Sequence, residues 1–308
     1  MLGTTAYAQV ITETFGTGAN SFSMDFVQIG NPGNVADTTG SPNPVGSVDY
    51  IYNLGKYEIS RDMINKANAV GGLGITMKDM TSYGGNGVNR PAALDWGWGN
   101  AMKFVNWLNT SKGYQVAYNT DYLGRFTLWG AGQYNGNNQY RHKDAYYFLP
   151  SVDEWYKGAY YDPNKEGGPG YWNYSTMSDT KPFAVKGGTI SGTAVYGQSV
   201  GTGPADVTDA GGLSASGTMA QGGNLWEWTE TSSDGINDST YDWRELRGGE
   251  WRSASDATSL DSSARASNGS SYNNGVLGFR VASVPEPSAL SLLAIGLGGL
   301  ALVRRRRS

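Results

Sequence analysis

The sequence predicts an α+β domain that is low in regular secondary structure. Its 308 residues include 45 Gly, 20 Tyr and 10 Trp, and only 16% of them are charged. Glycine favours turns over helix and strand interiors, and aromatic rings can pack into an irregular core. Such a composition is unlike that of a helical bundle. Three amphipathic segments predict the helices of this α+β class, and several short strand-like segments predict its strands.

The first predicted pair of elements is a strand followed by a helix. Residues 50–57 alternate in the manner of a strand and are rich in tyrosine. Ser60 then has the residue type that caps helix N-termini. Four apolar residues after it recur at helical spacing: Met63, Ile64, Ala67 and Val70.

Two further helices are predicted later in the chain. Residues 94–113 form an amphipathic segment with Gly113 as its stop. Ser151 and Glu154 have the S-x-x-E spacing of a capping box, so a third helix is expected to begin after Ser151. The apolar face of the second helix comprises Ala101, Phe104, Val105 and Leu108.

Residues 160–221 are rich in Gly, Ser, Thr, Asn and Pro and predict long loops or short hairpins. Strand-like pieces return in 244–255 and 275–283. A single domain from about residue 20 to 283 is therefore expected. Four aromatic residues within the loop-rich stretch are expected to be buried: Tyr161, Trp172, Tyr174 and Phe183.

The absence of cysteine excludes disulfides, thiolate metal sites and a thiol nucleophile. His142 is the sole histidine, so one chain cannot build a two-His or three-His metal site, and we expect it to be a surface or hydrogen-bonding residue. The formal charge of −4 includes four arginines in 304–307, which leaves about −8 on the remainder. Nucleic-acid binding is not expected from so acidic a body.

Both ends of the chain have the character of targeting segments. Residues 1–8 end in Ala-Tyr-Ala, a small-x-small cleavage pattern, and are expected to be the remnant of a signal peptide with the mature chain starting near Gln9. At the other end, 289–303 is a nearly unbroken apolar run. At ~1.5 Å per residue it is too short for a comfortable span of the ~30 Å hydrocarbon core. The arginines after it are expected to stay cytoplasmic and the body to be exported.

Residues 284–308 resemble the bacterial PEP-CTERM sorting signal. They contain its Pro-Glu-Pro motif at 285–287, its short hydrophobic helix and its arginine cluster. The resemblance implies that an exosortase-type enzyme cleaves the tail during export and that 289–303 are in the membrane only transiently. An ordinary short anchor that stays in place is the alternative. In either case the body is expected in the cell envelope or outside the cell.

Six motifs follow one another along the body: LGKYEIS (54–60), PAALDWGWGNAMKFVNWLN (91–109), LPSVDEWYKGAYY (149–161), GGNLWEWTE (222–230), LRGGEW (246–251) and GFRVAS (278–283). Together they resemble the sulfatase-modifying-factor domain of formylglycine-generating enzymes. This resemblance implies a formylglycine-generating-enzyme-like variant of the C-type lectin fold, with Trp226, Trp228 and Trp251 as nodes of the core.

The resemblance does not carry the family's activity to this chain. The aerobic enzymes of this family bind copper through two cysteines and oxidise a cysteine of a client sulfatase. The positions of the two copper-binding cysteines fall near Ser253 and Thr258 in this chain. A hydroxyl cannot replace a thiolate as a soft ligand for Cu(I). A sister group uses histidine-ligated iron, which one histidine cannot build. No catalytic residue and no organic cofactor are assigned.

The resemblance also implies a structural calcium site at the GGNLWEWTE turn. Its ligands would be the carbonyls of Gly223 and Leu225 and the side chain of Glu227, while Ala220 stands where an Asn or Asp would help. The alternative is that Glu227 accepts backbone hydrogen bonds. A general-acid role for Glu227 is not expected, because the sequence offers no second carboxylate that is convincingly paired with it.

The sequence therefore favours an exported, non-catalytic cell-surface or matrix protein, a pseudoenzyme acting as a binding module for exopolysaccharide or a surface protein. One alternative is an enzyme of unrecognised chemistry in the same cleft, without cysteine-bound copper. Four late arginines would line an anionic pocket in that case: Arg247, Arg252, Arg265 and Arg280. A structural component of an extracellular polysaccharide matrix is the third hypothesis.

Overall fold

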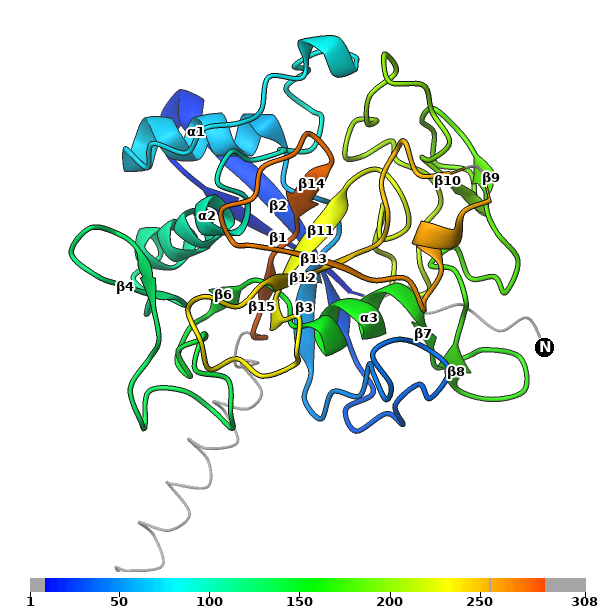
Figure 1. The fold of residues 1–308 in the computed structure, drawn as a ribbon, viewed down its shortest axis with the longest axis horizontal. Coiled ribbons are helices and arrows are strands. Elements are labelled where there is room, and N and C mark those ends of the chain that lie inside the picture. Colours follow the sequence, from blue (N-terminus) through cyan, green and yellow to red (C-terminus); the bar gives the residue numbers. More distant parts are fainter. Residues whose placement is uncertain (1–8, 255, 286–308) are drawn as a thin grey trace, which may run out of the picture.

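The computed structural model describes residues 9–254 and 256–285. The predictions for the signal-peptide remnant at 1–8 and for the sorting tail beyond Pro285 lie outside these residues. Within them the chain is an α+β fold with three α-helices and two main sheets (Figure 1). The predicted class, mixed and low in regular structure, is confirmed.

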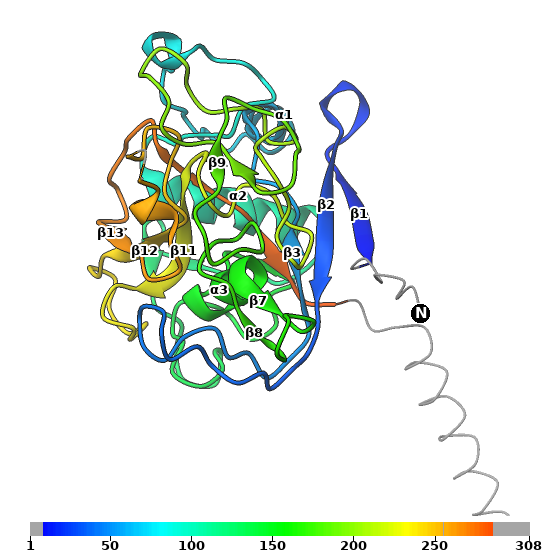
Figure 2. The ribbon, with the colours of Figure 1, turned by 90° about the vertical axis from the view of Figure 1, so that its right-hand side faces the viewer.

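The larger sheet has five strands in the order β1-β2-β3-β15-β6. The C-terminal strand β15 is therefore enclosed between two strands from much earlier in the chain. Figure 2 shows the long β1–β2 hairpin along one side of the molecule. Because β1 starts at Val10, the sheet includes residues before the predicted domain start at residue 20. The strands are β1 (Val10–Phe15), β2 (Phe22–Ile29), β3 (Tyr52–Gly55), β6 (Tyr147–Phe148) and β15 (Ala282–Ser283).

The second sheet has the order β13-β12-β11-β14, with β11 antiparallel to β12 and parallel to β14. Its central strand corrects one prediction, because most of GGNLWEWTE is a strand and not a turn. Only the part before Trp226 turns, with φ of 98° at Gly223 and 61° at Asn224. The strands are β11 (Trp226–Ser232), β12 (Arg244–Arg247), β13 (Ala266–Asn268) and β14 (Leu277–Phe279).

The three predicted helices are present as α1 (Arg61–Gly71), α2 (Gly97–Ser111) and α3 (Val152–Tyr160). Ser60 caps α1 by accepting a hydrogen bond from the Met63 N–H at 3.3 Å. The capping box of Ser151 and Glu154 is formed at α3. Helices α1 and α2 lie together on one side of the sheets, and α3 lies apart from them (Figure 1).

The stretch 160–221 consists of loops and very short strand pairs, as predicted. Tyr161 is buried, but Phe183 is 81% exposed, so its predicted burial is wrong. The remaining short elements are β4 (Asn119–Thr120), β5 (Phe126–Thr127), β7 (Tyr161–Asp162), β8 (Gly170–Tyr171), β9 (Phe183–Ala184), β10 (Thr193–Ala194) and the 3₁₀ turns at Gly18–Asn20, Thr81–Tyr83 and Thr258–Leu260.

Tryptophans form much of the core. Trp228 and Trp251 are fully buried as predicted, together with Trp98 and Trp155, whereas Trp226 is only partly buried. A close glycine-to-indole approach occurs at Gly248, where an added Cβ would meet the Trp155 ring at 3.1 Å. Within residues 9–254 and 256–285, no helix has the length and apolar character needed to cross a membrane.

Candidate functional site

Glu227 lies on β11 at the buried centre of the molecule, where it forms a two-pronged ion pair with Arg280. Arg280 follows β14, and since β11 and β14 are paired, the two side chains meet directly. The Arg280 Nη2 is 2.5 Å from Glu227 Oε1, and Nε donates to Oε2 at 2.6 Å. The indole N–H of Trp155 also donates to Oε2, at 2.7 Å. All three side chains are fully buried.

A second buried carboxylate, Glu58, lies beside this pair, so the prediction that no carboxylate is paired with Glu227 is wrong. It accepts hydrogen bonds from the Asn224 amide and from the Leu225 N–H. Burial, and then the negative charge of Glu227, raise the pKa of Glu58 well above its ordinary value. One network thus joins the motifs LGKYEIS, GGNLWEWTE and GFRVAS, and their polar residues are structural partners of one another.

The donor set around Glu227 does not fit the calcium ion that the resemblance implies. Calcium requires six to eight oxygen ligands. Both Glu227 oxygens already accept from Arg280 or Trp155, and a divalent cation bound there would lie beside a guanidinium. The geometry instead favours Glu227 as a buried hydrogen-bond acceptor. Its donors are side chains, whereas backbone donors were expected. Among the described residues no three His, Cys, Asp or Glu side chains are grouped to hold a metal.

The two positions that replace the family's copper cysteines have separate hydrogen-bond partners. Ser253 is buried in a tight turn, where its hydroxyl accepts from the Glu250 N–H at 2.8 Å. The Thr258 hydroxyl donates to Asp256 at 3.0 Å in an exposed turn. Both hydroxyls serve local backbone geometry.

The four late arginines are all engaged within the protein, which removes the anionic pocket predicted from them. Each is engaged as follows: Arg247 donates to the Ala264 and Ser262 carbonyls, Arg252 lies 3.5 Å from Glu250, Arg265 donates to Glu245 and the Ser233 carbonyl, and Arg280 holds Glu227. The enzyme alternative loses the observation on which it rested.

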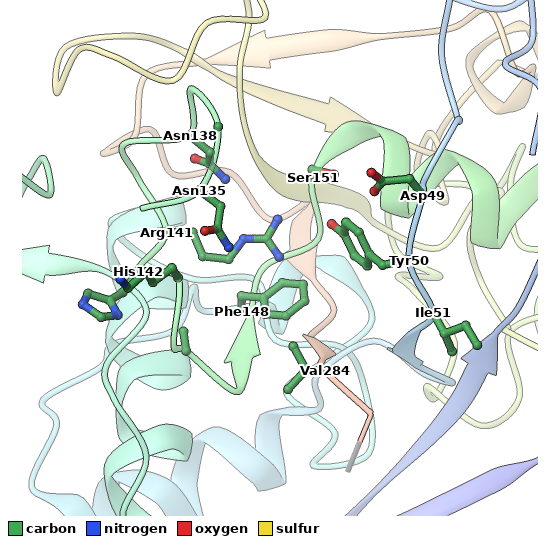
Figure 3. Close-up of a pocket in the computed structure, with 13 residues that line it drawn as sticks. Asp49, Tyr50, Ile51, Asn135, Asn138, Arg141, His142, Phe148, Ser151 and Val284 are labelled. Carbon is green, nitrogen blue, oxygen red and sulfur yellow. The ribbon is translucent and has the colours of Figure 1, made fainter. Parts of the chain in front are cut away.

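The structure instead presents a cavity of about 620 Å³ around Arg141. Its walls come from the segment before β3, the loop between β5 and β6, β6 itself, the start of α3 and Val284 after β15. In Figure 3 the Arg141 side chain reaches across the cavity toward Tyr50 with the Phe148 ring alongside, and the His142 imidazole points away. The guanidinium carbon lies 3.8 Å from the centre of the Phe148 ring.

Arg141 is held by two fully buried carboxylates. Its guanidinium nitrogens lie 3.1 Å from Glu154 and 2.7 Å from Glu230. Glu154 also accepts from the Tyr50 hydroxyl at 2.7 Å and from the Ser151 N–H at 2.6 Å. The capping box of α3 therefore places one of the two carboxylates that orient Arg141.

The two carboxylates differ in their hold on a proton. Burial raises the pKa of Glu154, but Arg141, Tyr50 and Ser151 outweigh burial and keep the pKa below its ordinary value. Burial raises the pKa of Glu230 to about 7 against the opposing effect of Arg141. Near neutral pH the charge of this cluster therefore depends on whether Glu230 holds a proton.

Three polar side chains at the cavity are open to a ligand. Within the described residues, no hydrogen bond or ion pair engages the side chains of Asp49, Asn135 or Lys143, which together offer donors and acceptors. His142 is the candidate that the segment QYRHKDAY suggests, whereas the cavity is built around its neighbour Arg141. An arginine among tyrosines, ahead of a capping box, was the available signal.

Two family descriptions match the chain. Residues 82–284 match the sulfatase-modifying factor enzyme 1-like domain, and residues 283–307 match the PEP-CTERM protein-sorting motif. A comparison with curated proteins gives no match.

Solved structures with similar folds cover nearly the whole chain. At 15 to 20% identity these likenesses establish the fold alone. Treponema denticola variable protein 1 matches with a TM-score of 0.59 and 20% identity, and the match covers 89% of this chain and 99% of that protein. PvdO from Pseudomonas aeruginosa matches with a TM-score of 0.53 and 16% identity, and the match covers 89% of this chain and 98% of PvdO. CarF matches with a TM-score of 0.52 and 15% identity, and the match covers 91% of this chain and 100% of CarF.

Proposed function

The chain belongs to the sulfatase-modifying factor enzyme 1-like family and carries a PEP-CTERM protein-sorting motif for export, and from this premise we propose that it is a non-catalytic binding module of the cell envelope or extracellular matrix. Its ligand enters the cavity around Arg141. An exosortase-type enzyme removes the tail, so that residues 289–303 occupy the membrane only during export.

The observation that supports binding over catalysis is the arrangement of the charged groups behind this cavity. Glu154 and Glu230 are fully buried and face Arg141, not the open space. Tyr50, Tyr118, Asn138 and the Ser151 N–H satisfy their remaining oxygens. A group that acts as acid or base must come within hydrogen-bond reach of the reacting atom. These carboxylates serve to fix Arg141 in place.

The cavity suits a polar ligand that has one apolar face. Phe148, Ile51 and Val284 provide apolar wall, and Asp49, Asn135 and Lys143 provide polar groups of both signs. A volume of about 620 Å³ is in the range of small-molecule sites. A saccharide unit at the end of an exopolysaccharide, or a short segment of a surface protein, has this size and character.

The test uses an occluding variant and a matched control from the same loop. Asn135→Trp places an indole in the cavity mouth, and Asn137→Trp adds the same ring to an exposed neighbour that does not line it. Binding of the exported protein to arrays of envelope polysaccharides and surface-protein peptides is measured for all three proteins. We expect Asn135→Trp to weaken binding at least ~10-fold, about 1.4 kcal/mol, and Asn137→Trp to leave it unchanged.

A catalytic assay runs in parallel. The purified protein is incubated with a cysteine peptide of a sulfatase, with oxygen and with copper. No formylglycine and no oxygen consumption are expected. Turnover of the peptide, or equal binding by native protein and Asn135→Trp, would overturn the proposal.

A further inference from the structure

A second concave site lies at the N-terminal end of α2 and shares no lining residue with the cavity around Arg141. It is a groove of about 430 Å³. Its walls are the first turns of α2, the β4–β5 hairpin and the segments around Tyr241 and Ser270. The first turns of α2 belong to the family motif at 91–109, but the buried network around Glu227 does not include any residue that lines this groove.

Two aromatic rings at this groove face solvent. Trp96 is 60% exposed and Tyr241 is 93% exposed. Single exposed aromatic residues are ordinary, but two at the border of one groove form an apolar surface that a ligand can cover. Trp and Tyr are the side chains that supply large, rigid contact area at low cost in conformational entropy.

The backbone at Trp96 has an unusual conformation beside the exposed ring. Trp96 has φ of 59°, in the left-handed region that bulky residues rarely adopt. The following Gly97 also has positive φ, and an added Cβ there would lie 2.3 Å from the Tyr272 carbonyl oxygen. The surrounding structure must enforce such a conformation, so the position of residue 96 at the edge of the groove is fixed.

Packed aromatic residues form part of the floor of the groove. Trp98 contacts Phe126 edge-on at 5.1 Å between ring centres, and Phe126 contacts Tyr140 at 5.3 Å. The buried Arg244 guanidinium lies 4.0 to 5.4 Å from the centres of these three rings. A preformed floor spares a ligand the entropy cost of ordering the site.

The polar rim offers donors and acceptors with little net charge. Asp121 and Arg125 pair at 2.7 Å, so their charges cancel, and Lys103 adds one cation. Hydroxyls of Thr127, Ser270 and other residues complete the rim. A neutral sugar ring matches this pattern because its hydroxyls both donate and accept, and its C–H face suits the electron-rich face of an aromatic ring.

We propose that this groove binds a neutral polysaccharide chain, with one sugar ring stacked on Trp96, another on Tyr241, and sugar hydroxyls bonded to the Asp121–Arg125 pair and Lys103. The proposal goes beyond the function assigned to the cavity around Arg141, because it adds a second site and a class of partner for it. The acidic charge of the body disfavours a polyanion as the bound chain.

The test compares groove variants with exposed aromatic residues outside the groove. Native gels containing a soluble neutral β-glucan, a neutral mannan or a polyuronate are run with the native protein, Trp96→Ala and Tyr241→Ala. The controls are Trp243→Ala, which removes an indole that is 56% exposed, and Tyr122→Ala, which removes a phenol ring that is 91% exposed; neither lines the groove. Because Tyr241 is almost fully exposed, its variant folds even where a change at Trp96 disturbs the turn.

We expect at least one neutral polysaccharide to retard the native protein and both controls, and each groove variant to raise the Kd at least ~10-fold. Binding should also change the tryptophan fluorescence of native protein, and this change should be lost in Trp96→Ala. Retardation by polyuronate alone, equal loss in the controls, or no retardation by any polysaccharide would each refute the groove. Loss of polysaccharide binding in Asn135→Trp with normal binding in Tyr241→Ala would place the sugar in the cavity instead. Enzymatic turnover would refute only the proposed function.

Discussion

Arg280 is the residue on which the buried centre of the molecule most depends. Besides Glu227, it donates to the carbonyls of Gly55 and Met219, so it connects β3, the loop before β11 and β11 itself. Its partner carboxylate has no exposure to water. Removing the guanidinium would leave Glu227 and Glu58 charged or protonated in the core without their cation.

Arg280→Met should therefore be severely destabilising. Breaking a buried ion pair by removing one partner costs about 3–5 kcal/mol of the free energy of unfolding. Arg252→Met, which removes a partly exposed arginine 3.5 Å from Glu250, should cost less than about 1 kcal/mol. Urea unfolding measures the free energy of unfolding that each variant loses. Equal losses in the two variants would contradict the central role of Arg280.

Calcium should leave the stability of the protein unchanged. The two Glu227 oxygens accept from Arg280 and Trp155, and a divalent cation would have to displace those donors. Thermal melts in excess calcium and in excess chelator are expected to coincide. A melting temperature that rises with calcium concentration would show that the ion binds the native state.

Glu230 gives stability a pH dependence of predictable sign. Its pKa is about 7 in the folded protein and 4.5 ordinarily, so between these values the native state holds more protons than the unfolded chain. The free energy of unfolding therefore falls as pH rises through this window. From pH 5 to 8 the contribution is roughly 2 kcal/mol.

Glu230→Gln removes the titrating carboxyl, since glutamine does not titrate, while the other buried carboxylates, including its neighbour Glu154, remain in both proteins. The native protein should lose stability relative to the variant as pH rises from 5 to 8. Urea unfolding at several pH values measures the difference. Parallel pH profiles would rule out Glu230 as the titrating group.

At the scale of elements, local signals identified the helices well. Ser60, Ser151 and Glu154 make the predicted caps because capping requires only residues three apart in the chain. The strand pairs could not be derived in this way, since β3 pairs with β15 from the other end of the body. Phe183 shows the same limit, because burial depends on neighbours that are distant in sequence.

The candidate site was harder to predict than the helices. The family pattern points to Glu227, Ser253 and Thr258 as site positions. In the structure each of these side chains has a hydrogen-bond partner within the protein. The cavity around Arg141 depends on Glu154 and Glu230, which are far apart in sequence and meet only in the folded chain. No spacing rule connects them.

Helix α3 links local stability to this cavity. Ser151→Ala should lower the free energy of unfolding by about 1 kcal/mol, because the Glu154 N–H loses its acceptor. Ligand binding at the cavity should weaken as well, since Glu154 positions Arg141. Ser151→Thr, which retains a capping hydroxyl and adds no charge to the cavity that residue 151 lines, is the control and should stay close to native in both urea unfolding and binding. Binding that survives in Ser151→Ala would uncouple the cap from the site.

At the scale of the whole molecule, the enclosed position of β15 sets where the chain can be shortened. A chain ending after Pro285 keeps β15 between β3 and β6 and should retain the native far-UV spectrum and melting transition. A chain ending after Val281 loses the strand and exposes the backbone groups of both neighbours, so it should be unfolded or protease-sensitive. Limited proteolysis and thermal melts distinguish the two. Survival of the shorter chain would show that β15 is dispensable.

Strand β15 also determines when the fold can be completed during export. A polypeptide that emerges from a translocation channel N-terminus first presents β3 and β6 long before β15. The gap between them stays open until almost the entire body has crossed, and closing it requires contact between residues far apart along the chain, the kind of contact that forms slowly. The fold can therefore be completed only when the sorting motif is also emerging, because β15 adjoins the start of that motif.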